Sequence, residues 1–148
     1  MLLGIVHDLF HGNPKLRRSP LGVSLTHEMR FGASGDADGS RIGGHLCRFG
    51  YGLPDCRVWR YWDESQPLKA SGAPAKTLVL SRDGKVLVVV ASYGPGGDVI
   101  LDLDLEVLGV GGDAEAVNVE TGDPVKRVAP GRYDLPLPRH DFRVIRIG

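Results

Sequence analysis

The chain has 148 residues, of which 42% are hydrophobic and 24% charged, and its 18 basic side chains balance 18 acidic ones. This neutral balance gives no overall field that would attract nucleic acid or an anionic membrane, so we expect neither as a partner. Glycine (21) and proline (10) are frequent but follow no period, which excludes collagen and favours a turn-rich β protein. A chain of this length can bury a sizeable core, but about one and a half domains is its limit.

Proline and glycine interrupt the first 40 residues repeatedly. Asn13-Pro14 predicts a break, because the residue before a proline avoids the helical conformation. Residues 19–22, with the sequence Ser-Pro-Leu-Gly, predict a second break. Residues 23–30 alternate weakly and fit a short strand or one helical turn, and residues 32–39 predict a loop.

A short helix is predicted over residues 40–49. Ile42, Leu46 and Phe49 have helical spacing, Ser40 can cap the N-terminus, and Gly50 follows as a C′ residue. Residues 56–62 alternate enough to predict a strand, and residues 65–74, rich in Ser, Gly and Pro, predict a linker.

The second half of the sequence has the pattern of a β protein, in which short apolar segments alternate with turn residues. Residues 76–81 and 85–92 flank Asp83-Gly84, a dipeptide typical of hairpin turns. Residues 86–91 are apolar on both faces, which predicts a central buried strand. Further short strands are predicted at residues 99–105, 114–120, 125–128, 133–137 and 142–147. This pattern predicts an antiparallel β-sandwich or barrel-like domain with a core that includes Val86, Val88, Val90, Leu101, Leu135 and Phe142.

The order of several motifs carries a resemblance to a known family. The motifs are Phe49-Gly50 with Asp55, Tyr61-Trp62, residues 76–80, residues 84–90, Leu101-Asp102-Leu103-Asp104 through Leu108-Gly109, Thr121-Gly122 after Val119-Glu120, and residues 140–145. In this order they resemble the C-terminal region of glycoside-hydrolase-like proteins, in which a (β/α)8 barrel is followed by an antiparallel β-domain. The resemblance covers about residues 42–148.

The resemblance implies a division of the chain and a role for it. Residues 1–70 would be an irregular α+β segment like the end of the barrel, and residues 75–148 a β-sandwich accessory domain. A full barrel needs about 250 residues, so we expect no catalytic residues here and no glycoside hydrolysis by the chain alone. The implied role is to pack on and stabilise a carbohydrate-active barrel. The apolar side chains that would then be exposed, ready to contact that barrel or a second copy of the first half, are Leu9, Phe10, Leu46, Phe49 and Trp59.

A run of aromatic residues suggests a second hypothesis, a carbohydrate-binding module. Trp59, Tyr61 and Trp62, with Asp63 at the rim, could stack against sugar rings and bind their hydroxyls. Strand alternation would put Trp59 and Tyr61 on one face and Trp62 on the other, which favours packing over binding. Co-planar exposed rings would favour binding, and buried rings would favour packing.

A third hypothesis is a small metal-dependent hydrolase whose site lies in the His-rich first half. His7 and His11 are four residues apart and could bind a metal with His27 or Glu28. Asn13-Pro14 would end such a helix quickly, so we predict no metal and no cofactor. The acidic row of Asp98, Asp102 and Asp104 could suggest calcium, but a strand lays these carboxylates in a line, which predicts a solvated face instead.

Overall fold

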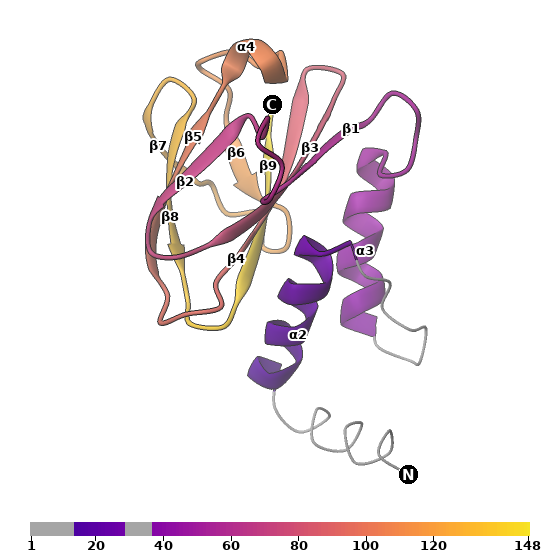
Figure 1. Ribbon diagram of the computed structural model, residues 1–148, viewed down its shortest axis with the longest axis vertical. Helices are drawn as coiled ribbons and strands as arrows, with labels where there is room; N and C mark the ends of the chain where they lie inside the picture. The colour runs from indigo at the N-terminus through magenta and orange to yellow at the C-terminus, as the bar shows by residue number, and fades with distance from the viewer. Residues whose placement is uncertain (1–13, 29–36) are drawn as a thin grey trace.

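The computed structural model describes residues 14–28 and 37–148, which are arranged in three layers (Figure 1). The elements in chain order are α2 (Pro14–Thr26), α3 (Ala37–Phe49), β1 (Arg57–Arg60), β2 (Leu68–Gly72), β3 (Lys76–Arg82), β4 (Lys85–Ala91), β5 (Gly97–Leu103), α4 (Leu105–Leu108), β6 (Ala116–Asn118), β7 (Lys126–Ala129), β8 (Arg132–Leu137) and β9 (Phe142–Ile147). One sheet has the order β1-β3-β4-β9-β6 and the other the order β2-β5-β8-β7. Neighbouring strands run antiparallel, which confirms the prediction of a mainly β, antiparallel fold.

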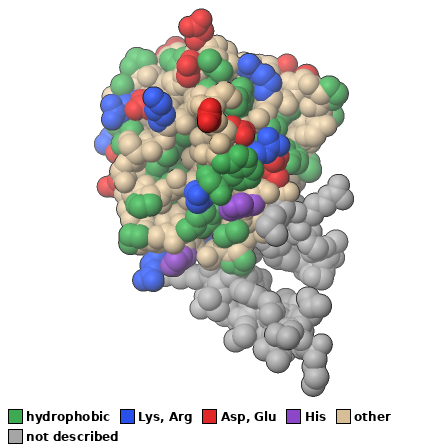
Figure 2. Space-filling model, viewed as in Figure 1, with side chains coloured by type: hydrophobic (Ala, Val, Ile, Leu, Met, Phe, Trp, Pro, Cys, Tyr) green, Lys and Arg blue, Asp and Glu red, His purple; other side chains and the backbone are tan. Residues whose placement is uncertain are grey.

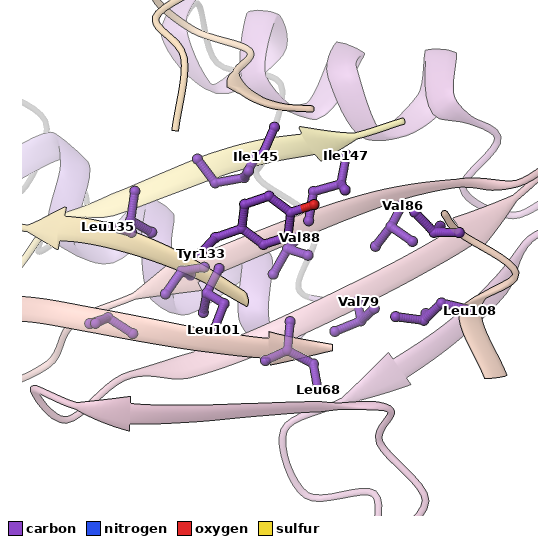
Figure 3. Packing of buried hydrophobic residues seen from close by; sticks show 14 of the residues in the cluster. Leu68, Val79, Val86, Val88, Leu101, Leu108, Tyr133, Leu135, Ile145 and Ile147 are labelled. Carbon is purple, nitrogen blue, oxygen red and sulfur yellow. The ribbon is translucent and has the colours of Figure 1, made fainter. Parts of the chain in front are cut away.

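The sandwich core lies between the two sheets (Figure 3). Val88 and Ile145 of the five-stranded sheet face Leu101 and Tyr133 of the four-stranded sheet across this space. The Tyr133 side chain is fully buried, and its hydroxyl donates to the carbonyl of Ala114 at 2.7 Å. The predicted core residues Val86, Val88, Val90, Leu101, Leu135 and Phe142 are all buried, which confirms that part of the prediction.

The five-stranded sheet is buried on both of its faces. Val88 of β4 points into the sandwich, while Leu87 and Val89 point to the other side and contact the helical layer. Phe142 also lies on the helical side rather than in the sandwich core. The sequence of a strand that is covered on both faces is a continuous apolar run. This pattern correctly predicted that β4 is a central, buried strand.

The helices α2 and α3 supply the third layer. Leu21 and Leu25 of α2 and Ile42 and Leu46 of α3 pack against the outward-facing apolar side chains of β3, β4 and β9. The expectation that the first half exposes apolar side chains is therefore wrong for Leu46, which is 6% exposed. It is also wrong for Phe49 and Trp59, which pack against the two clusters of buried side chains. The reason is that the sheet itself offers these side chains an apolar surface. Leu9 and Phe10, named in the same expectation, lie outside the described residues.

The predicted break at residues 19–22 is wrong, because α2 continues through Pro20. The prediction of a strand or single turn at residues 23–30 also missed this helix. Proline inside a helix costs about 3 kcal/mol in local terms, but packing of Leu21 and Leu25 on the sheet opposes that cost. Gly22 helps, since a Cβ there would already lie 3.4 Å from the side chains of Ala91 and Phe142. The helix can thus approach the sheet closely.

The predicted linker at residues 65–74 contains strand β2, which pairs with β5. The strand was missed because it is an edge strand in which Leu68 alone is buried, so its remaining residues resemble a polar loop. Gln66 fixes the entry to this segment by hydrogen bonds with Thr77, whose hydroxyl donates to Oε1 at 3.0 Å. With β1 and β2, the sheets thus extend N-terminal of residue 75, the predicted start of the sandwich.

Two other predicted boundaries shift. Helix α3 begins at Ala37, three residues before the predicted cap Ser40, but it ends at Phe49 as predicted. Gly50 has a φ of 118°, and its amide donates to the carbonyls of Leu46 and Cys47 at 3.2 and 3.1 Å. Among the described residues, no helix combines the length and the apolar content that a membrane crossing requires.

Candidate functional site

The predicted aromatic residues divide into two groups. Trp59 lies in β1 and packs against the sandwich core, while its neighbour Val58 packs on the helical side, as strand alternation predicts. The Arg57 guanidinium lies 5.0 Å from the centre of the Trp59 ring, within the range of a cation–π contact. Trp59 is therefore a packing residue at the edge of the sheet.

Tyr61 and Trp62 lie in the turn that follows β1. Their ring centres are 4.7 Å apart and their planes meet at 84°, so the predicted placement on opposite faces of a strand is wrong. The strand ends at Arg60, whose amide donates to a carboxylate oxygen of Asp63 at 2.7 Å. The amide of Asp63 in turn donates to the Arg60 carbonyl at 2.9 Å. Asp63 thus stabilises the turn that brings the two rings together.

His27 joins these rings from the end of α2. Its ring centre lies 5.4 Å from that of Tyr61, 5.8 Å from that of Trp62 and 6.4 Å from that of Tyr93. Its Nδ1 lies 2.9 Å from the Val23 carbonyl, which can only accept, so Nδ1 carries a proton. In the neutral ring Nε2 then accepts the hydrogen bond from the Tyr61 hydroxyl at 2.9 Å. We call His27, Tyr61, Trp62 and Tyr93 the aromatic cluster.

Buried polar contacts hold the aromatic cluster in place. The Thr26 hydroxyl donates to the Gly22 carbonyl at 3.0 Å, and the Tyr93 hydroxyl donates to the Thr26 oxygen. Burial raises the pKa of Tyr93 above its usual value, so this phenol stays protonated at neutral pH. The Lys76 ammonium lies 3.6 Å from the centre of the Tyr61 ring. Tyr61 is therefore held on its face and at its hydroxyl.

Glu28 connects the end of α2 to two further elements. It accepts a hydrogen bond from the Tyr51 hydroxyl at 2.7 Å and another from Nε of Arg60. Burial and the hydrogen bond to Glu28 raise the pKa of Tyr51 to about 12. Glu28 has a φ of 54°, the left-handed conformation common just after a helix. Its carboxylate is thus occupied by protein donors.

The metal hypothesis gains no support from the described residues. His27 and Glu28, the candidate third ligands, bind Tyr61 and Tyr51 instead. The other two candidates, His7 and His11, lie outside the described residues. Among the side chains that the structure describes, no three of His, Cys, Asp or Glu gather as a metal site requires.

The acidic row of β5 has the predicted solvated character. The side chains of Asp98 and Asp102 are exposed. Asp104 lies beyond the end of the strand, and its carboxylate accepts from the Val107 amide at 3.1 Å as the N-cap of α4. The strand therefore ends before Leu105, which was predicted to extend it.

A second polar cluster connects α2 to the sandwich. The Arg18 guanidinium donates to both oxygens of Glu120, at 2.9 and 3.0 Å, and Nε donates to Asp141. Burial alone would raise the pKa of Asp141, but hydrogen bonds from Arg18 and Arg143 and from the Phe142 amide hold it below its usual value. This cluster anchors the helical layer.

Taken as a binding surface, the aromatic cluster presents one ring to solvent. Trp62 is 49% exposed, whereas Tyr61 and Tyr93 are half-buried. Because the Tyr61 and Trp62 planes are nearly perpendicular, these rings do not form a flat platform. The sequence predicted Tyr61, Trp62 and Asp63 as candidate site residues. It did not predict Tyr51 or Tyr93, which reach the site from other segments.

Comparisons of the chain with known protein families, with curated proteins and with solved structures find no match.

Proposed function

We propose that this chain is a non-catalytic accessory region of a glycoside-hydrolase-like protein, and that it packs on and stabilises a carbohydrate-active barrel. The observation that carries the proposal is the burial of the five-stranded sheet on both faces, with α2 and α3 as its outer cover. Helices fixed in this way by apolar packing and by Arg18 suit a rigid connection between a sandwich and a helical neighbour.

The geometry of the aromatic cluster favours packing over sugar binding. Sugar-binding platforms need rings that a pyranose can cover, and the 84° between Tyr61 and Trp62 leaves Trp62 without a parallel neighbour in Tyr61. A single half-exposed tryptophan surrounded by half-buried rings is typical of a protein contact. We therefore expect Trp62 to contact the barrel.

The proposal is tested with a purified (β/α)8 barrel that carries glycosidase motifs and lacks a β-domain of its own. The tagged chain should capture this barrel and raise its melting temperature. Trp62→Asp should abolish capture, while Val128→Asp, at an exposed site on β7, should not. The chain alone should hydrolyse no aryl glycoside. Failure to capture, or turnover by the chain alone, would contradict the proposal.

A carbohydrate-binding module is the second candidate, and the exposure of Trp62 beside Asp63 and Glu64 favours it. In this role the Trp62 ring would stack on one sugar and the carboxylates would accept from its hydroxyls. Titration with oligosaccharides, followed by tryptophan fluorescence, separates the two candidates. Saturable quenching that Trp62→Ala removes would favour the module over the accessory role.

A further inference from the structure

A pocket lined by basic side chains lies between the last turn of α3 and the helix-facing side of the five-stranded sheet. Its volume is about 410 Å³, and its lining includes Arg48, Arg82, Lys85 and Arg146 but one carboxylate, Asp83. The chain as a whole is neutral, and on the face shown in Figure 2 acidic and basic side chains are interspersed. The concentration of positive charge in this basic pocket is therefore local.

The strand periodicity explains how the sheet contributes three of these cations. Lys85 shares a face with Leu87 and Val89 of β4, and Arg146 shares a face with Val144 of β9. Where the helices cover the sheet these positions are apolar, and towards the end of the sheet they become basic. Lys85 is directly opposite Arg82 in the β3–β4 pair, and like charges so placed destabilise a sheet.

Helix capping explains two of the four cations. Arg48 lies in the last turn of α3, and Arg82 packs on Gly50, where a Cβ would come within 2.8 Å of its guanidinium. Cations at a helix C-terminus are stabilising. Arg82 also donates to Asp55 at 2.9 Å. These roles do not extend to the cations on β4 and β9.

Lys85 and Arg146 have no such structural explanation. In the described part of the chain, neither has a carboxylate within 4.0 Å. Asp83, the carboxylate of the pocket, has a side chain that is 78% exposed and lies 3.6 Å from Arg82. The partial negative charge at the end of α3 is about half a unit, so the basic side chains outweigh it.

His45 adds a neutral donor to the basic pocket. Burial and the charges of Arg48 and Arg41 hold the pKa of His45 below its usual range. Arg48 lies 3.3 Å from Nδ1 of His45, and because a guanidinium can only donate, Nδ1 accepts. The proton of the neutral ring is therefore on Nε2.

We propose that the basic pocket binds the phosphate group of a small phosphorylated molecule. A phosphate dianion accepts several N–H bonds and pairs well with guanidinium groups. Phe49, Leu87 and Val119 line the same pocket and provide apolar contact for a small organic body. The volume suits a small ligand, and the neutral chain lacks the extended positive field that polyanions need. This site is independent of the proposed contact with a barrel.

The test is calorimetric titration of the full chain at low ionic strength with inorganic phosphate, a hexose 6-phosphate and the unphosphorylated hexose. The double variant Lys85→Gln/Arg146→Gln removes the two cations that lack a structural role. Lys69→Gln/Arg139→Gln, at two exposed residues outside the pocket lining, is the matched control for the loss of two positive charges. Circular dichroism melting curves check that each variant is folded.

We expect both phosphate-bearing probes to bind and the hexose not to bind. The double variant should weaken binding at least tenfold, because it removes two charge-assisted hydrogen bonds to the phosphate, while the control keeps its affinity. Tighter binding of the hexose phosphate identifies an organic monoester as the ligand, and equal binding identifies free phosphate. Absence of binding, equal binding by a folded double variant, or equally tight binding of the unphosphorylated hexose would overturn the proposal.

Discussion

The Tyr61 hydroxyl lies 2.9 Å from Nε2 of His27, and this hydrogen bond joins the turn after β1 to the end of α2. The two residues are 34 positions apart in the sequence, yet their rings meet edge to face at 5.4 Å. The contact therefore couples the helical layer to the edge of the five-stranded sheet.

Tyr61→Phe should lower the free energy of unfolding by about 1 kcal/mol, because one part-buried hydrogen bond is lost. Urea denaturation measures this change. The ¹⁵N shifts of His27 should show a proton on Nδ1 in the unmodified chain, because the Val23 carbonyl can only accept. A proton on Nε2 instead would contradict this arrangement.

Val88→Ala should destabilise the sandwich by about 1–3 kcal/mol, since it leaves a cavity between the sheets. Val88 is completely buried in the sandwich core. The matched control is Val128→Ala, since Val128 is 44% exposed and should change stability by less than about 0.5 kcal/mol. Equal effects of the two variants would show that β4 is not central.

Asp141 should make the stability of the chain sensitive to acid. Its pKa in the folded state is below the unfolded value, so its contribution is present above a pH of about 4 and is lost as pH falls through the lower folded pKa. The free energy of unfolding of Asp141→Asn should therefore fall less between pH 5 and pH 2. Val128→Ala, at an exposed residue that carries no charge, should retain the original slope.

Gly72→Ala should be strongly destabilising, because Gly72 combines a φ of 88° with a close approach to the backbone of β5. A Cβ there would lie 2.5 Å from the carbonyl oxygen of Asp98, so the β2–β5 pair must separate or shift. Gly94→Ala provides the control, since nothing lies within 4 Å of its Cβ position. Equal melting temperatures of the two variants would contradict the close approach of β2 and β5.

The strands with strong local patterns could be predicted from the sequence. Residues 85–92 combine a continuous apolar run with an Asp-Gly turn, and both features appear in the β3–β4 hairpin. Strand β2 could not be predicted, because one buried residue, Leu68, carries no period. Helix α2 was missed because Pro20 is a local signal for a break, whereas the packing that opposes it comes from β4 and β9.

The candidate site was predictable only in its continuous part. Tyr61, Trp62 and Asp63 are adjacent in the sequence, so two aromatic residues followed by a carboxylate could be recognised there as a candidate site. Their arrangement in the fold depends on the end of β1 at Arg60 and on the contact with His27 of α2. Both depend on tertiary structure, which the local sequence does not encode. Tyr93 reaches the same place from a loop after β4, and no spacing rule connects it to residue 61.

The contacts of Arg18 set the order in which the chain can be completed. Arg18 lies in the first of the described helices, but it donates to the carbonyl of Phe142 and to Asp141, at the start of the last strand. A ribosome releases β9 after the other described elements, and β9 lies between β4 and β6 in the five-stranded sheet. During synthesis α2 can therefore complete its contacts with the sheet only after β9 has emerged. Docking of the helical layer is a late step that closes a separation of 123 residues.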